Sequence, residues 1–90
     1  MKMSEYRILE RKWLAENPLG KWRADNMLFL KDVGAAIGVG YHTVFRWESG
    51  MSMPNEIQMI ALIKLTKNKN LATQFQRWKN SRPLLGKEKK

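Results

Sequence analysis

The spacing of apolar positions along the chain is typical of helices. Apolar residues recur at intervals of three and four and nowhere alternate with polar residues over a useful length, so the pattern predicts an all-α chain of about five helical segments. A first helix is expected over about residues 4–16, with Ser4 as its N-cap. Asn17, a good capping residue, precedes Pro18, which is favoured at the first helical position, so a second helix is expected from there to about Met27. The apolar stripe with which the first helix covers the core is expected to be Tyr6, Leu9, Trp13 and Leu14.

Two short helices joined by a three-residue turn follow in the middle of the chain. The first is expected over residues 30–37, where Gly38 stops it, and the second begins after Gly40 and ends before Gly50. Gly34 is small enough to let the two helices cross closely. The inward-facing apolar residues of this pair are predicted to be Val39, Val44 and Trp47.

The C-terminal third holds two more helical segments. Asn55 caps the first of them, and Gln58 three residues later completes a capping-box pattern before an apolar body that extends to Leu65. The last helix is expected at about residues 70–80, and residues 83–90 are expected to form a basic flexible tail. Apolar residues of the last helix, spaced by four and three, are Leu71, Phe75 and Trp78.

Composition limits the class of protein. A chain of 90 residues with 43% hydrophobic residues and four Trp suits one small packed domain, which we place at residues 1–82 with its core at about 18–66. Cys is absent and His42 is the single His, so we expect no disulfide, no metal site and no cofactor. No apolar run approaches the roughly 18–20 residues that cross a bilayer, and the first residues contain no signal-peptide core. A cytoplasmic, nucleoid-associated protein is therefore expected.

The charge of the chain is concentrated at one end. The formal net charge is +9, and residues 57–90 carry nine Lys/Arg against one acidic residue, whereas residues 1–56 carry eight against seven. Clustered cations bind polyanions by releasing their counterions, so charge favours a nucleic acid as the partner. Acidic proteins and membrane headgroups are the alternatives that charge alone leaves open.

The segment from Leu30 to Gly50, with the sequence LKDVGAAIGVGYHTVFRWESG, resembles the helix-turn-helix of the Cro/Xre family of phage and bacterial transcriptional regulators. The resemblance covers roughly residues 18–66, and its most specific part is RWESG at residues 46–50 followed by Pro54. It implies a compact bundle of the lambda-repressor-like DNA-binding type with a helix-turn-helix at about residues 30–50. The implied function is a sequence-specific DNA-binding transcriptional regulator, in this family more often a repressor, acting as a dimer on a palindromic operator.

The second helix of this motif carries the candidate base-reading residues. If Val44 and Trp47 point inward, the opposite arc faces the major groove. Arg46 is the best candidate, because a guanidinium matches guanine O6 and N7 in a bidentate fork; a solvated Arg is the alternative. His42 either contacts a base or stays idle, and Phe45 either meets thymine methyls or folds back onto the protein. The predicted base-reading residues are Tyr41, His42, Phe45 and Arg46.

The family resemblance also implies an ion pair. Positions where this sequence differs from the family change which residues are expected to bind phosphate. Arg23 stands where the family often has an Arg that pairs with the Glu of the recognition helix, here Glu48. Phe29 occupies a position where Ser or Thr is common, and residues 51–53 replace a stretch often rich in Lys and Arg. Phosphate contacts are expected from Lys31, Lys21, Thr43 and the amide of Gly40.

The basic C-terminal third is a further candidate for phosphate contacts, with a solubilising face as the alternative. Its cations are Lys64, Lys67, Lys69, Arg77, Lys79 and Arg82.

Two functions from different classes fit these features. A homodimer of a DNA-binding regulator is expected to form through the C-terminal helices, with Leu71, Phe75 and Trp78 at the interface. The alternative is an antitoxin or another protein-interaction module that also binds DNA and uses the same stripe and the tail for a protein partner. An enzyme is not expected, because the sequence has no nucleophilic Cys, no phosphate-cradling glycine-rich loop and no obvious carboxylate pair.

Overall fold

A computed structural model describes residues 2–83, which form six α-helices and no strand. The all-α prediction is confirmed for these residues. The predicted count of about five was one too low, although each of the six helices corresponds to a segment that was located from the sequence. Residues 84–90 of the predicted tail lie outside the described part. The helices are α1 (Met3–Ala15), α2 (Pro18–Asp25), α3 (Leu30–Ile37), α4 (Tyr41–Ser49), α5 (Glu56–Thr66) and α6 (Leu71–Asn80).

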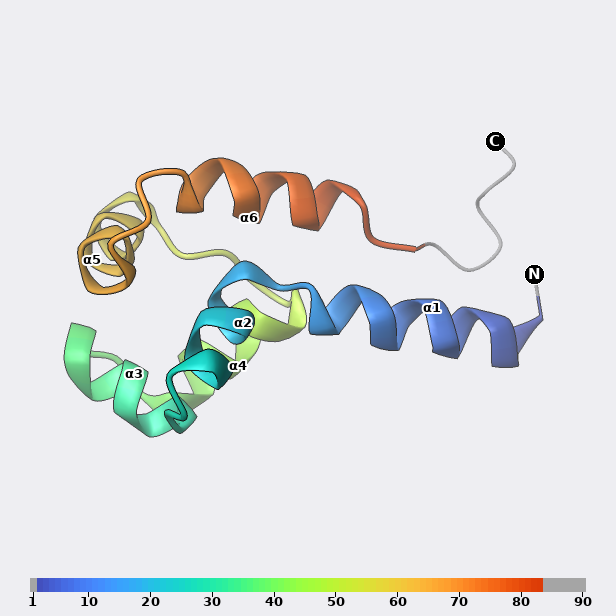
Figure 1. Ribbon diagram of the computed structural model, residues 1–90, viewed down its shortest axis with the longest axis horizontal. Coiled ribbons are helices and arrows are strands. Elements are labelled where there is room, and N and C mark those ends of the chain that lie inside the picture. The colour runs from blue at the N-terminus through green and yellow to red at the C-terminus, as the bar shows by residue number, and fades with distance from the viewer. Residues whose placement is uncertain (1, 84–90) are drawn as a thin grey trace.

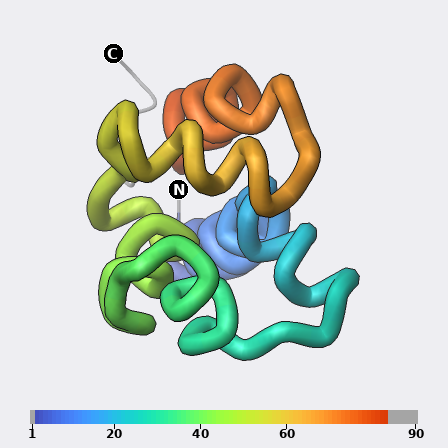
Figure 2. Tube along the Cα trace, turned by 90° about the vertical axis from the view of Figure 1, so that its left-hand side faces the viewer, coloured from blue at the N-terminus to red at the C-terminus, as the bar shows by residue number. Residues whose placement is uncertain are grey.

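The core lies between the α3–α4 pair on one side and α6 on the other. Figure 1 shows α6 along the top, α3 and α4 below it, and α5 at the left connecting the two levels. Figure 2 shows the same order from the side, with α3 at the bottom and α6 at the top. All six helices contribute to one continuous cluster of buried side chains, which are Trp13, Leu19, Val33, Val44, Trp47, Met59, Leu62, Leu71, Phe75 and Trp78.

The α1 helix meets this core only near its C-terminal end, and the rest of it extends away from the bundle (Figure 1). Trp13 is its single buried residue. The predicted core-covering stripe was therefore mostly wrong, since Leu9 is 42% and Leu14 37% exposed and Tyr6 is half-buried. Periodicity identified the helix correctly, but no other helix of the described residues buries Leu9 or Leu14.

A pair of tryptophans ties α1 to the end of α6. The rings of Trp13 and Trp78 stack with centroids 4.0 Å apart and planes 4° from parallel. Each indole N–H donates to the backbone carbonyl of the other tryptophan at 2.6 Å. Arg82 lies 5.0 Å from the Trp13 ring centroid and pairs with Glu10 at 3.6 Å. This clasp satisfies both buried indole donors, so α1 and α6 are joined without an unpaired polar group.

Caps predicted from the sequence are present at two helices. The Asn17 side chain accepts from the Gly20 amide at 2.8 Å, with Pro18 in the first turn of α2. The Asn55–Gln58 capping box is confirmed in both directions, at 2.9 and 2.8 Å. At α1 the predicted Ser4 cap was wrong, because that helix already begins at Met3 with Lys2 as N-cap.

A left-handed glycine ends α4 and packs against the clasp, and this contact generates a prediction. Gly50 and Gly38 have nearly the same backbone, with φ of 82° and 81°, so alanine at either site incurs the same strain of about 1–2 kcal/mol. A Cβ at Gly38 meets nothing within 4 Å, whereas a Cβ at Gly50 would lie 2.6 Å from a ring carbon of Trp13. We expect Gly50→Ala to lower the free energy of unfolding by about 3 kcal/mol and Gly38→Ala by about 1 kcal/mol. Urea denaturation followed by circular dichroism measures both; equal losses would contradict the packing argument.

Candidate nucleic-acid interface

The turn between α3 and α4 brings the two helices into backbone contact. Gly38 adopts the left-handed conformation at the end of α3, and the Val39 amide donates to the Gly34 carbonyl at 2.9 Å. A Cβ placed on Gly34 would lie 2.5 Å from the Val39 carbonyl oxygen. The predicted roles of both glycines in the turn and the crossing are thus confirmed, because a side chain at Gly34 would push the helices apart.

The two faces of α4 differ sharply in burial. Val44 and Trp47 are 0% and 2% exposed, as predicted, and Val39 packs against the same core while partly buried. The opposite side of the helix is open, with Tyr41 51% and Phe45 49% exposed. We call this side the exposed arc, and it consists of Tyr41, His42, Phe45 and Arg46.

Two residues of the exposed arc contact each other. The rings of Tyr41 and His42 stack with centroids 4.1 Å apart and an interplanar angle of 29°. No side chain caps α4, whose N-cap is Gly40. The first turn of α4 therefore presents a pair of polar aromatic groups beside amides that no side chain of the described part covers.

The structure brings some of the predicted phosphate contacts together and separates one. Lys31 lines a shallow, mostly apolar hollow with Phe29, Leu30 and Tyr41, so it lies beside the exposed arc. Thr43 and Gly40 belong to the first turn of α4 and its cap. Lys21 lies elsewhere, in a hollow between α2 and α6.

The Arg23–Glu48 pair is formed and holds α2 against the end of α4. Arg23 donates from Nε to Glu48 Oε2 at 2.7 Å and from Nη2 to Oε1 at 2.9 Å, and its Nη1 donates to the Leu28 carbonyl at 2.9 Å. The hydrogen bond to Glu48 raises the pKa of Arg23 above its ordinary value, against the opposing effect of burial, and the negative charge of Glu48 adds to the rise. The two side chains are 24% and 13% exposed. This bidentate geometry is the strong form of a charge-assisted pair.

A second tie to the end of α4 comes from a residue that sequence reasoning interpreted only as a cap. Asn17 is completely buried, and its side-chain amide donates to the Trp47 carbonyl at 3.2 Å while its oxygen caps α2. One side chain therefore serves two helices. Its place before Pro18 revealed the cap, but a contact 30 residues away leaves no local pattern in the sequence.

The predicted interface residues of the last helix were wrong. Leu71, Phe75 and Trp78 are 1%, 0% and 5% exposed and belong to the chain's own core. Their spacing correctly indicated an apolar face on α6, but that face covers the α4 side of the core rather than a second molecule. After α4, the large apolar side chains of the described residues that stay exposed are Met51 of the loop and Ile57 and Ile60 of α5.

The cations of the C-terminal third lie away from the exposed arc. Val44 and Trp47 on α4 and the buried residues of α6 belong to one core, so the exposed side of each helix faces away from that core. Figure 1 shows α6 and α3 at opposite edges of the molecule.

Comparison with protein-family models, with curated proteins and with solved structures gives no match. Within residues 2–83, no group of three or more His, Cys, Asp or Glu side chains is placed to hold a metal ion. No helix in that part of the chain has the length and apolar character needed to span a membrane. Functional inference therefore depends on the geometry of the chain's own residues.

The ion pair leads to a prediction about stability. Arg23→Ala leaves Glu48 partly buried without its partner and leaves the Leu28 carbonyl without its donor. We expect a loss of about 2–3 kcal/mol in the free energy of unfolding, less than the roughly 3–5 kcal/mol of a fully buried pair because water reaches both side chains. Arg23→Lys keeps the charge but cannot form the fork, so an intermediate loss is expected. Urea denaturation of the three proteins measures this, and equal stability of Arg23→Ala and the original chain would exclude the role.

Proposed function

We propose that the chain is a sequence-specific double-stranded DNA-binding regulator in which α3 and α4 form a helix-turn-helix and α4 enters the major groove. The observation that supports this most directly is the exposed arc, which lies on a short helix whose other face is buried. A helix with one face fixed in the core and a polar, aromatic and cationic face outward is suited to reading base edges.

The chemistry of the exposed arc suits each residue to a different contact. Arg46 reads guanine through its bidentate fork, and Tyr41 and His42 offer stacked rings with hydrogen-bonding groups to a base or a phosphate. Phe45, half exposed, meets the methyl group of thymine. Lys31, beside Tyr41, provides a phosphate contact, together with Thr43 and the amide of Gly40.

A single reading helix covers only a few base pairs, so the proposal includes a homodimer on a palindromic site and repression by occupation of that site. The stripe of α6 is buried and unsuited to this contact. On α5, Ile57 and Ile60 are 79% and 49% exposed and offer the apolar surface for dimer formation instead. The alternative of an antitoxin-like interaction module was based on the α6 stripe and the tail. The stripe is buried and unsuited to a partner, and residues 84–90 of the tail lie outside the described residues.

Selection of binding sites from random duplex DNA tests the proposal. A palindromic consensus is the expected outcome, whereas equal affinity for all sequences with a steep dependence on salt would contradict specific reading.

Arg46→Ala is expected to relax the preference at one base pair of each half-site and to reduce discrimination there by about 1–3 kcal/mol. The matched control is Arg11→Ala, which removes an exposed cation of α1, away from the exposed arc. The control should lower the affinity for all sequences slightly and keep the consensus. Repeating the site selection with both variants measures this, and a full consensus in Arg46→Ala would refute the assignment of Arg46.

Phe45→Ala tests the thymine contact without changing any charge. Replacing a contacted thymine by uracil removes one methyl group from the site, which is worth about 0.8 kcal/mol, or roughly a fourfold change in affinity. We expect one thymine of the half-site to show this loss with the original chain and no loss with Phe45→Ala. Competition binding with uracil-substituted duplexes measures the difference. If both proteins respond alike at every thymine, Phe45 does not meet a methyl group.

A further inference from the structure

The surface formed by α6, the turn before it and the end of α5 carries exposed cations that have no role in the proposed reading of DNA by α4. Between Ile57 and Pro83 the chain has six Lys/Arg and no Asp/Glu. All six cations are exposed, and within the described residues only Arg82 has an ion-pair partner, Glu10. We call this the basic surface, and its cations are Lys64, Lys67, Lys69, Arg77, Lys79 and Arg82.

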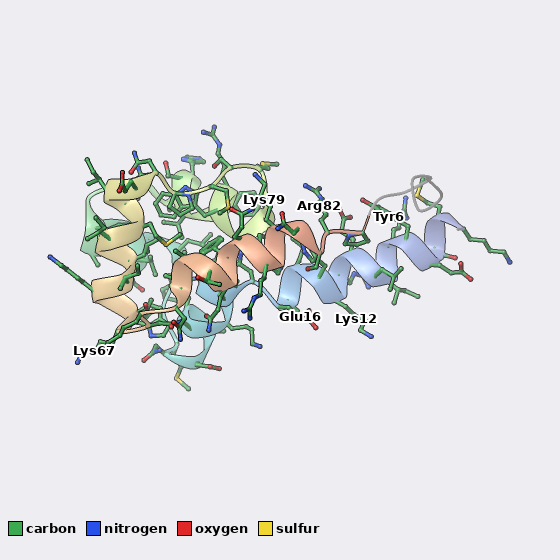
Figure 3. The ribbon with its side chains drawn as sticks, turned by 90° about the horizontal axis from the view of Figure 1, so that it is seen from above. Tyr6, Lys12, Glu16, Lys67, Lys79 and Arg82 are labelled. Carbon is green, nitrogen blue, oxygen red and sulfur yellow. The ribbon has the colours of Figure 1, made fainter. Side chains whose placement is uncertain are left out.

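The basic surface and the exposed arc lie on different helices, α4 and α6 contribute buried side chains to one core, and both surfaces face away from that core. Figure 3 looks down on the basic surface, with α6 in front and with Lys67, Lys79 and Arg82 marking its extent from the end of α5 to the residues after α6. The α3 helix lies on the far side of the core from α6 (Figure 1). A duplex held by the exposed arc therefore lies against a different side of the molecule from the outer side of α6.

Distance weakens the electrostatic attraction between the basic surface and a duplex bound by α4. The bundle measures 22 Å along its second axis, which is the direction that separates α6 from α3 in Figure 1. The Debye length at physiological ionic strength is about 8 Å, so a charge on one side is largely screened at the other. The electrostatic attraction between these cations and a duplex read by α4 is therefore weak, so the cations are available to bind a second polyanion.

The side chains between the cations favour a phosphate backbone over other polyanionic surfaces. The outward residues of α6 include Thr73, Gln76 and Asn80, and α6 exposes no large apolar side chain. Membrane-binding helices insert an apolar face, and protein interfaces use aromatic and aliphatic anchors, neither of which is present on the outer side of α6. Phosphate oxygens instead accept hydrogen bonds from Lys, Arg, Thr, Asn and Gln.

We propose that the basic surface binds the phosphate backbone of a second DNA duplex, so that the protein bridges two duplexes, one read by α4 and one held without sequence preference by α6. This inference rests on the proposed function only for the first duplex. Binding of the second depends only on the cations of the basic surface.

Two triple variants with the same net charge test the proposal. One is Lys69→Gln, Arg77→Gln and Lys79→Gln, which neutralises the basic surface. The matched control is Arg7→Gln, Arg11→Gln and Lys12→Gln, which removes three exposed cations from α1. None of these six residues forms an ion pair with another residue of the described part, so both variants should keep the fold.

The experiment immobilises a short duplex that carries the selected site, saturates it with protein and adds a fluorescent duplex without the site. The original chain and the α1 control should retain the fluorescent duplex. The α6 variant should bind the immobilised duplex within about twofold of the original chain but retain the fluorescent one at least tenfold less well, because about three phosphate contacts are lost. The slope of log affinity for the second duplex against log salt concentration should be shallower by about 3 for the α6 variant than for the original chain.

Three outcomes would overturn the inference. The first is that the original chain retains no fluorescent duplex. The second is that the α6 variant loses affinity for the immobilised duplex, which would place these cations on the DNA that α4 reads. The third is that bridging survives in the α6 variant, which would assign it to two reading helices of a dimer. Failure of the proposed function is separate: it appears as absence of a consensus in site selection, and the bridging test can then use two site-free duplexes.

Discussion

The position of α4 depends on how its last turn is held. Trp47 is buried, its carbonyl accepts a hydrogen bond from Asn17, and the adjacent Glu48 is bound in a bidentate fork by Arg23. The next glycine, Gly50, packs its open side against the ring of Trp13. Side chains from α1 and α2 thus converge on one turn, and each contact satisfies a polar group or fills space that would otherwise be lost.

This arrangement leaves the first turn of α4 comparatively free. Its N-cap is Gly40, which supplies no capping side chain, and Tyr41 and His42 stack on each other rather than on the core. A helix held at its C-terminal end and open at its N-terminal end presents amide groups and the positive end of its dipole outward. Anions gain from such an end, so the geometry that fixes α4 also favours a phosphate near Thr43 and Gly40.

Signals confined to neighbouring residues could be predicted from the sequence. Local backbone chemistry predicts three helix boundaries, at Gly38, at Gly50 and at the Asn55–Gln58 capping box. In the structure α3 ends at Gly38, α4 ends at Gly50 and α5 begins after Asn55. The Arg23–Glu48 pair came from family resemblance, since 25 residues separate its members.

Two predictions failed because they depended on what covers the apolar face of a helix. The face of α1 was predicted to be buried and is largely exposed, whereas the face of α6 was predicted to meet a second molecule and is buried in the chain's own core. Periodicity shows that a helix has such a face but contains no information on its partner. Leu9 on α1 is left exposed because α1 extends beyond the bundle, whereas Phe75 on α6 is buried because α6 closes the core above α4. The same pattern therefore gives a solvent-exposed stripe in one helix and a core contact in the other.

The division of charge places a constraint on the DNA complex that we propose for α4. Residues 1–56 have a net charge of +1, and the cations of α6 are screened across the 22 Å of the bundle. One reading face must then hold a duplex through few direct contacts, chiefly Arg46, Lys31 and the end of α4. A small number of phosphate contacts gives weak and only mildly salt-dependent binding. Useful affinity on this side requires either two reading faces acting together on a palindrome or a second surface that keeps DNA close. The exposed Ile57 and Ile60 of α5 suit a dimer contact that would supply the first, and the basic surface would supply the second.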